Sequence, residues 1–262
     1  MSRAQRETVR EELRDGVLLL TLDRPRRKNA FNERQYDDLR LALAAAREDG
    51  DVRVVVVTGA PGAFSAGQDI SELGKPPTPD GEPHGFTPFV DELSTFDKPL
   101  VAAVNGVAVG IGVTLLLHCD LVYVAESARL RAPFVALGLV PEAGSTLLLP
   151  LVVGPQAAAE LLLGAPWIDA RRAVEIGLAR RAVPDEELLD VALGQAREIA
   201  RQAPAAVREA KRLLLATRAE ALLAAREREE RIQAHRIGSP ENREAVRAFE
   251  EKRPPDFDRF RG

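Results

Sequence analysis

The stretch that most constrains the fold of this chain is a short strand followed by a glycine-rich turn, within residues 100–120. The apolar run Leu100–Val104 has the length and composition of a buried β-strand. The turn after it carries three glycines, which let the backbone approach a neighbouring group closely: Gly106, Gly110 and Gly112. From Val113 onward the apolar residues recur at helical spacing. The pattern indicates either a tight packing turn or a site where free N–H groups meet negative charge.

A second turn of small residues follows another apolar strand, residues 52–58. It runs from Gly59 to Ile70 with the sequence Gly-Ala-Pro-Gly-Ala-Phe-Ser-Ala-Gly-Gln-Asp-Ile. Two strands of one sheet that end in such turns can direct two backbone N–H groups at one point. That is the geometry of an oxyanion hole, so the two turns together favour a catalytic site over simple packing.

Composition is that of a globular protein and argues against several other classes. Apolar residues make up 45% and charged residues 29% of the 262 residues, enough for one or two domains. The net charge of −4 gives no basis for binding nucleic acid or an anionic membrane surface. The single cysteine, Cys119, excludes an internal disulfide and suits a reducing compartment. We recognise no apolar leader or membrane-spanning run, so we expect a cytoplasmic protein that binds no membrane.

Strand and helix patterns alternate up to about residue 183 and then give way to helices alone. Apolar runs predict strands over residues 16–22, 52–58, 100–104, 121–124, 130–133 and 178–183. Periodicity predicts helices over residues 32–49, 155–163, 170–176, 185–202, 205–216, 218–236 and 240–251. Three of these helices have a predicted N-cap: Asn32, Asp169 and Ser239. The order indicates an α/β core followed by a helical C-terminal part.

Three motifs in this order resemble the crotonase superfamily of enoyl-CoA hydratases and isomerases. They are Phe64-Ser-Ala-Gly-Gln-Asp-Ile70, Asn105-Gly-Val-Ala-Val-Gly-Ile-Gly112 and Leu137-Gly-Leu-Val-Pro-Glu-Ala-Gly-Ser145. The resemblance spans roughly residues 16–253, with gaps in detail around residues 72–96. It implies an α/β fold, a spiral of ββα units over residues 1–203 that carries an acyl-CoA site. Residues 204–262 would form a helical region that assembles a homotrimer or a dimer of trimers.

Matching the motifs residue by residue places the two oxyanion-hole donors on the backbone N–H groups of Gln68 and Ile111. Both donors are main-chain groups, so an isoleucine where glycine is more usual keeps the hydrogen bond and narrows the pocket. Losing one such donor typically slows catalysis by about 10²–10³-fold.

The acidic positions distinguish the branches of the superfamily. Hydratases use two glutamates to position a water molecule and shuttle its proton, and these positions fall on Thr114 and Phe134 here. Glu142 instead occupies the position where the Δ3,Δ2-enoyl-CoA isomerase branch carries its single catalytic acid. One carboxylate is enough to move a proton from C2 to C4. Without the motifs, Glu142 would be interpreted as a surface glutamate after a proline.

The resemblance also implies a set of residues that contact the acyl-CoA. Besides Gln68 these are Lys28, Ala30, Ala66, Gly67, Asp69, Ile70, Gly110, Phe134 and Lys252. Lys28 belongs to a basic segment beside the expected CoA phosphates, with a solvated turn as the alternative. Asp69 also fits a cap of the following short helix, and Lys252 a cap of the last helix.

Two polar stretches receive no catalytic role. Residues 74–88 hold five prolines and predict no regular element. They form either a mobile loop over the acyl pocket or an inert surface excursion. The charge run at residues 227–231 is interpreted as the solvated face of a helix.

Several other kinds of site are not supported. The three histidines, His84, His118 and His235, share no metal-ligand spacing, so we expect no metal site. Leu115 stands where a dinucleotide-binding fingerprint needs its third glycine. Neither a phosphate-binding loop nor a Gly-x-Ser-x-Gly elbow is present.

The sequence therefore predicts an acyl-CoA enzyme, a Δ3,Δ2-enoyl-CoA isomerase of unsaturated fatty-acid breakdown. CoA enters as part of the substrate, and no separate cofactor is expected. One alternative is a 2-(1,2-epoxy-1,2-dihydrophenyl)acetyl-CoA isomerase, which also uses a carboxylate at the Glu142 position, usually Asp. The others are a weak enoyl-CoA hydratase and a non-catalytic homologue that binds acyl-CoA or RNA, although no basic surface stripe supports the last.

Overall fold

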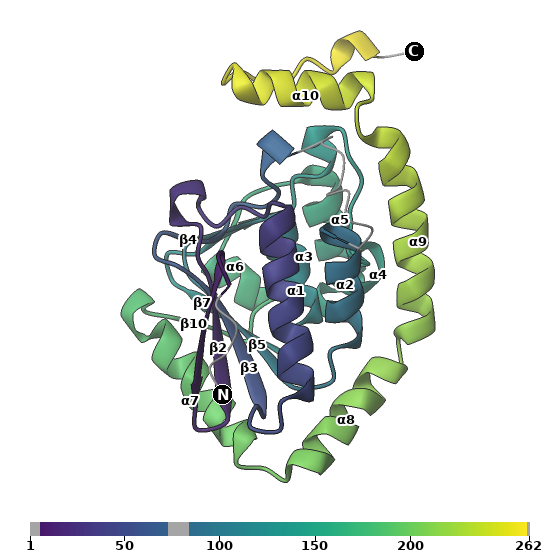
Figure 1. Ribbon diagram of the computed structural model, residues 1–262. Helices are drawn as coiled ribbons and strands as arrows, with labels where there is room; N and C mark the ends of the chain where they lie inside the picture. The colour runs from purple at the N-terminus through teal and green to yellow at the C-terminus, as the bar shows by residue number, and fades with distance from the viewer. Residues whose placement is uncertain (1–5, 73–83, 261–262) are drawn as a thin grey trace.

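The computed structural model describes residues 6–72 and 84–260, and its centre is a six-stranded sheet (Figure 1). The spatial order of this sheet is β1 (Val9–Arg14), β2 (Val17–Leu22), β3 (Val54–Gly59), β5 (Leu100–Val104), β7 (Leu121–Ala125) and β10 (Arg181–Val183). Strand β1 pairs antiparallel with β2, and the other neighbours are parallel. β1 was not predicted, because the charged residues in Val9–Arg14 mask its alternation.

The continuous apolar sequence of β3 reflects burial of both faces of the sheet. Val54 and Val56 pack in one core cluster beneath helix α7 (Leu188–Ala200). Val55 and Val57 point the other way, into the larger core that includes α1 (Glu33–Glu48). Strands covered on both sides are apolar at every position rather than at alternate positions, which is why β3 was predicted correctly.

A second, smaller sheet carries the two glycine turns. It contains β4 (Ala63–Ser65), β6 (Val107–Val109), β8 (Arg129–Arg131) and β9 (Ile168–Asp169). The two glycine turns were predicted to follow β3 and β5 directly, and this was wrong. The chain first crosses from β3 into β4 and from β5 into β6, and β4 pairs with β6 in parallel. Strands of two or three residues are too short to produce a periodic signal.

Three predicted helix N-caps are confirmed by their hydrogen bonds. Asn32 Oδ1 accepts from the Gln35 N–H of α1 at 3.0 Å. Asp169 Oδ1 accepts from the Arg172 N–H at 2.8 Å, at the start of α6 (Ala170–Glu175). Ser239 Oγ accepts in the same way at 3.2 Å, at the start of α10 (Pro240–Glu250). Helices α5 (Pro155–Gly164) and α7 also form where they were predicted, except that a 3-10 turn, η5 (Asp185–Glu187), precedes α7.

Three predictions about helices need correction. Helix α2 (Phe86–Thr95) begins inside the stretch predicted to be irregular, and its proline, Pro88, lies in the first turn, where a missing N–H costs little. Residues 73–83 of that stretch lie outside the described residues. Helix α3 (Ile111–Thr114) is a single turn that continues as the 3-10 turn η3 (Leu115–His118), not a longer helix from Val113. Helix α4 (Ser145–Val153) was not predicted, because Pro150 interrupts its pattern.

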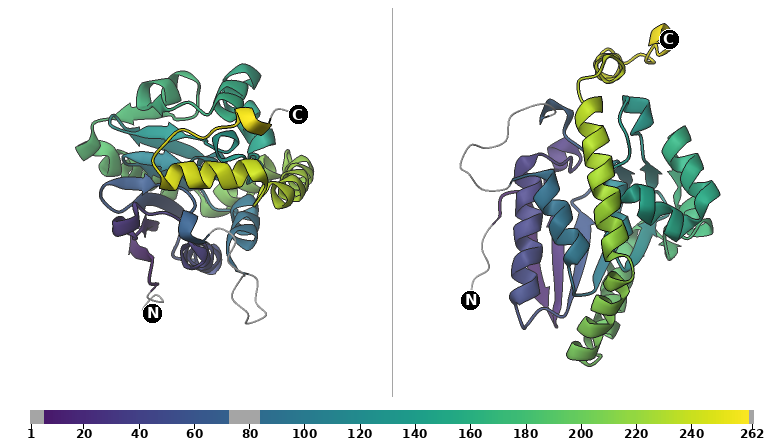
Figure 2. Two further views of the ribbon diagram at one scale, coloured as in Figure 1. Left: turned by 90° about the horizontal axis from the view of Figure 1, so that it is seen from above. Right: turned by 90° about the vertical axis from the view of Figure 1, so that its right-hand side faces the viewer.

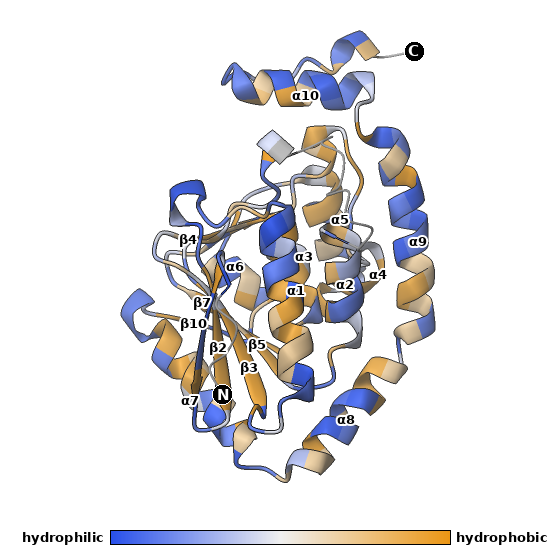
Figure 3. Ribbon diagram, in the orientation of Figure 1, coloured by the Kyte–Doolittle hydropathy of each residue, from blue (hydrophilic) through white to orange (hydrophobic). Residues whose placement is uncertain are grey.

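The C-terminal helices wrap the outside of the α/β core. Helices α8 (Pro204–Ala216) and α9 (Ala219–Arg236) run along one side, and α10 lies across the end near α9 (Figures 1 and 2). Figure 3 shows apolar strands at the centre and mixed polar and apolar surfaces on α8–α10. Leu213, Leu214 and Phe249 on these helices are each more than 60% exposed. The proposed division at residue 203 stays a prediction. No helix among the described residues is long and apolar enough to cross a membrane.

Candidate active site

The two glycine turns lie against each other at one edge of the smaller sheet. Because β4 and β6 are parallel neighbours, the residues that follow them emerge side by side. A Cβ built on Gly110 would be 4.0 Å from the Cα of Gly67, and one built on Gly67 would be 2.9 Å from the Val109 carbonyl oxygen. Both glycines have positive φ, +53° and +91°. Glycine is therefore required at both positions by conformation, and at Gly67 also by space.

The two predicted donors have free N–H groups at this junction. Around Gln68, the Phe31 N–H donates to the Gly67 carbonyl at 2.7 Å, and the Asp69 N–H donates to the Phe31 carbonyl at 2.8 Å. Within the described residues, the N–H groups of Gln68 and Ile111 have no hydrogen-bond acceptor. Two unpaired donors on adjacent turns are what a developing oxyanion needs.

The side chain of Gln68 is held by Tyr36 of α1. The Tyr36 hydroxyl donates to Gln68 Oε1 at 2.6 Å, and Tyr36 is only 2% exposed. Burial, and then the negative charge of Glu142, raise the pKa of Tyr36 well above its usual value. In the sequence Tyr36 lies within the predicted helix 32–49, and no role in the site was predicted for it. A tyrosine hydroxyl needs a hydrogen-bond partner once it is buried, and this requirement is the sequence signal that could have marked Tyr36 as a site residue.

Glu142 combines partial exposure with a strongly perturbed carboxyl. The residue is half-buried, and its carboxyl makes no hydrogen bond to any described residue. Burial, followed by the charge of Glu229, raises the pKa of Glu142 to about 8. A carboxyl group with a pKa near the working pH can both accept and return a proton. Glu142 is thus suited to acid–base chemistry.

The two positions at which hydratases carry their glutamates hold no carboxylate here. Thr114, in α3 beside the donor Ile111, is 1% exposed, and its buried hydroxyl finds no partner in the described part of the chain. Phe134 is 5% exposed and belongs to the main apolar core. Neither side chain can deprotonate a water molecule.

The structure brings most of the predicted binding residues together along one edge. The Ala66 N–H donates to the Lys28 carbonyl at 2.9 Å, so the segment that holds Lys28 and Ala30 runs beside residues 66–69. The Lys28 side chain is exposed. Ile70 begins a short 3-10 turn immediately after these residues. Lys252 is exposed, just beyond the end of α10.

The carboxylate of Asp69 is already engaged. It accepts from the Ser71 N–H and hydroxyl at 3.2 and 2.7 Å and pairs with Arg24 at 3.1 Å. Burial opposes its charge, but the bonds from Ser71 and Arg24 prevail and hold the pKa of Asp69 below its usual value. These contacts agree with the alternative interpretation of Asp69 as a local cap.

Glu229 of α9 is an exception to the predicted solvated face at residues 227–231, of which Glu227, Arg228 and Arg231 are exposed. Glu229 is 4% exposed and accepts hydrogen bonds from the Gly144 and Thr146 N–H groups at 2.6 and 2.8 Å. Its buried neighbour, Arg226, is 6% exposed and pairs with Asp91 at 2.7 Å. Charged residues on a helix that packs over a core are buried when they have partners, and those partners are distant in sequence.

A further group of ionisable side chains lies between α1 and the start of α2. Side chains of Glu33, Asp37 and His84 offer ligand atoms within 4.8 Å of one another, a grouping that the histidine spacing did not predict. His84 Nδ1 lies 2.6 Å from an Asp37 oxygen, and the Gly85 N–H donates to the other oxygen at 3.0 Å. These contacts tie the start of α2 to α1.

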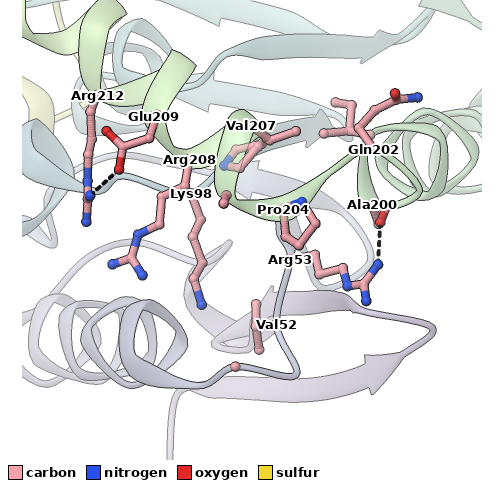
Figure 4. Close-up of a pocket in the computed structure, with 14 residues that line it drawn as sticks. Val52, Arg53, Lys98, Ala200, Gln202, Pro204, Val207, Arg208, Glu209 and Arg212 are labelled. Atoms are coloured by element: carbon pink, nitrogen blue, oxygen red, sulfur yellow. Dashed lines mark hydrogen bonds and ion pairs between the residues drawn. The ribbon is translucent and has the colours of Figure 1, made fainter.

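A hollow of about 340 Å³ lies at the opposite ends of β3 and β5 from the glycine turns (Figure 4). Each cationic side chain that lines the hollow already has a protein partner. Lys98 Nζ donates to two carbonyls at the end of α1, each at 2.7 Å, and Arg53 donates to the Ala200 carbonyl at 3.0 Å. Arg208 and Arg212 both pair with Asp97 at 2.8 Å. The candidate site is therefore assigned to the glycine turns.

The fold and the paired turns define an enzyme scaffold of the crotonase type. The sequence model of the enoyl-CoA hydratase/isomerase family matches residues 12–259, so the chain belongs to this family. The predicted superfamily and fold class are both confirmed.

Relatives named for different activities are about equally similar to the chain. The 2,3-dehydroadipyl-CoA hydratase of Escherichia coli K12 is 36% identical over 245 residues, which cover 92% of this chain and 94% of the relative. The 1,2-epoxyphenylacetyl-CoA isomerase of the same organism is 35% identical over 257 residues, covering 96% and 98%. A crystal structure of an enoyl-CoA hydratase/isomerase from Pseudoalteromonas atlantica T6c is 41% identical with a TM-score of 0.92, covering 96% and 100%. The chain is a crotonase-family acyl-CoA enzyme.

Proposed function

We propose that this enzyme is a Δ3,Δ2-enoyl-CoA isomerase that works with one carboxylate. One observation carries the proposal. Glu142 has a pKa raised to about 8, and the two positions at which hydratases carry glutamates hold Thr114 and Phe134 instead. A hydratase needs acid–base groups that act on water, whereas a 1,3-proton shift needs a single group that accepts and returns one proton.

The reaction follows from the two turns and Glu142. The thioester carbonyl oxygen accepts hydrogen bonds from the N–H groups of Gln68 and Ile111, which lowers the cost of enolate formation. The Glu142 carboxylate removes a proton from C2, and the electron pair moves into a dienolate. Protonated Glu142 then delivers that proton to C4, and the double bond ends between C2 and C3. Phe134 keeps the pocket apolar, which disfavours attack by water.

A second candidate is isomerisation of a ring epoxide carried on an acetyl-CoA. The similarity to the 1,2-epoxyphenylacetyl-CoA isomerase supports it.

The deciding experiment is a comparison of substrates with the purified protein. We expect 3-enoyl-CoA to be isomerised at least about 10²-fold faster than 2-enoyl-CoA is hydrated, because two acid–base groups are missing for hydration. Conjugation is followed by ultraviolet absorbance and hydration by mass spectrometry, at matched concentrations. If 2-enoyl-CoA is hydrated as fast as 3-enoyl-CoA is isomerised, or faster, the isomerase proposal is wrong. Turnover of the ring epoxide alone would select the second candidate.

We also propose that the enzyme assembles as a homotrimer or a dimer of trimers through its C-terminal helices. The exposed apolar side chains of Leu213, Leu214 and Phe249 support this, because exposed apolar patches mark protein interfaces. Light scattering of the full chain should give a trimeric or hexameric mass. Deleting residues 240–262 should weaken both association and CoA binding. A full-length protein that is active as a monomer would contradict the proposal.

A further inference from the structure

We propose that Glu229 of α9 is a positioning residue for Glu142, because it fixes the turn after Glu142 and keeps a negative charge beside it. The inference rests on the proposed role of Glu142 as the proton-transfer group. It makes the C-terminal helical region part of the active site of its own chain.

Glu229 makes three short hydrogen bonds to the chain just after Glu142. Its two oxygens accept from the Gly144 N–H at 2.6 Å, the Thr146 N–H at 2.8 Å and the Thr146 hydroxyl at 2.5 Å. Hydrogen bonds to an ionised group are about twice as strong as those between neutral groups. The side chain thus clamps the start of α4, two to four residues after Glu142.

These hydrogen bonds hold an unusual backbone conformation. Ala143 and Gly144, which follow Glu142 directly, have φ values of +59° and +75°. Such a conformation is unfavourable for alanine and persists only when its surroundings enforce it. A Cβ built on Gly144 would lie 2.2 Å from Leu222 Cδ1, so the turn is pressed against α9. His118 also contributes, since its Nε2 lies 2.9 Å from the Ala143 carbonyl oxygen.

The two carboxyl groups differ in the donors around them. The pKa of Glu229 is raised, chiefly by burial, although the bonds from Thr146 and Gly144 and the charge of Arg226 oppose this rise. Glu142 has no such donors, and its pKa is raised to about 8. Two interacting carboxyl groups in unequal surroundings separate into one that stays ionised and one that carries the proton. The three donors that Glu229 accepts from favour the charge on Glu229 and leave the proton to Glu142.

The remaining groups around Glu142 leave Glu229 as its charged neighbour. Tyr36 of α1 is neutral, because burial and Glu142 raise the pKa of its hydroxyl. His118 of η3 is also neutral at pH 7, because burial lowers its pKa to about 4. Arg226 of α9 forms an ion pair with Asp91. Removing the charge of Glu229 should therefore make Glu142 ionise at lower pH.

The test compares Glu229→Gln with Glu227→Gln, a control at an exposed position on the same helix. The midpoint of Glu142 ionisation is followed by NMR of ¹³C-labelled glutamate carboxyls, with the Glu142 signal identified by its absence in Glu142→Gln. This readout needs no turnover, so it separates failure of this inference from failure of the proposed function. The Glu227→Gln control should keep the wild-type midpoint.

In Glu229→Gln we expect the midpoint to fall by about 1 pH unit, the size of a nearby like charge. Turnover should fall by about 10- to 100-fold with little change in KM, because Glu142 is misplaced. The rising limb of kcat/KM should move to lower pH together with the midpoint, since Glu142 acts as a base only when ionised. Glu229→Asp keeps the negative charge but moves it farther from Glu142. Its midpoint should lie between those of the wild type and Glu229→Gln.

An unchanged midpoint in folded Glu229→Gln would overturn the inference, because a purely structural role lowers stability without moving that midpoint. If Glu229→Gln does not fold, Glu229→Asp decides. A midpoint below the wild-type value supports the proposal, and a wild-type midpoint overturns it.

Discussion

Replacing Glu142 by Gln should lower isomerase turnover by about 10²–10⁴-fold, the usual contribution of general acid–base catalysis. Glutamine keeps the size and polarity of the side chain but cannot accept the proton. Because the pKa of Glu142 is about 8, the wild-type side chain is largely uncharged at neutral pH. The affinity for acyl-CoA should therefore change little.

The measurements are kcat with 3-enoyl-CoA, exchange of the C2 proton with D₂O, and calorimetric binding of the substrate. Isomerisation and exchange should disappear together, since both begin with the same proton abstraction. Glu126→Gln, at an exposed glutamate, serves as the control. If Glu142→Gln retains more than about a tenth of the rate, another base is at work. Asp69 and Glu92 would be tested next, although Arg24 and Arg47 already pair with them.

The second large effect is expected from Gly67→Ala. The new Cβ would lie 2.9 Å from the Val109 carbonyl oxygen, on a backbone with φ of +91°. The turn has to shift, and the Gln68 N–H moves away from the carbonyl oxygen that it is proposed to stabilise. Loss of one oxyanion-hole donor typically costs about 10²–10³-fold in kcat. We expect a decrease of that size.

The matched control is Gly62→Ala, because Gly62 has φ of +107° but nothing within 4 Å of a built Cβ. It carries the conformational cost without the collision, so its turnover should stay within a few-fold of wild type while its stability falls by about 1–3 kcal/mol. The Glu142 ionisation midpoint should be unchanged in both variants. Equal turnover in Gly67→Ala and Gly62→Ala would argue against a catalytic role for the Gln68 turn.

The central parallel strands of the larger sheet and the capped helices were predictable because their signals are local. Strand β3 is apolar at every position, and Asn32, Asp169 and Ser239 each cap the helix that follows them. The strands β4 and β6 were missed because three residues show no periodicity. Their parallel pairing nevertheless decides where the two glycine turns meet.

The sequence by itself determined the superfamily, the α/β core, and the candidate roles of Gln68, Ile111 and Glu142, since these depend on motifs of contiguous residues. Only the tertiary structure decided what surrounds them. Tyr36 reaches Gln68 across 32 positions, and Glu229 reaches Gly144 across 85. Residues 227–231 look solvated as a linear pattern, but α9 packs over α4 and buries Glu229 against free N–H groups. A carboxylate is buried when distant donors compensate its charge, and only folding brings those donors to it.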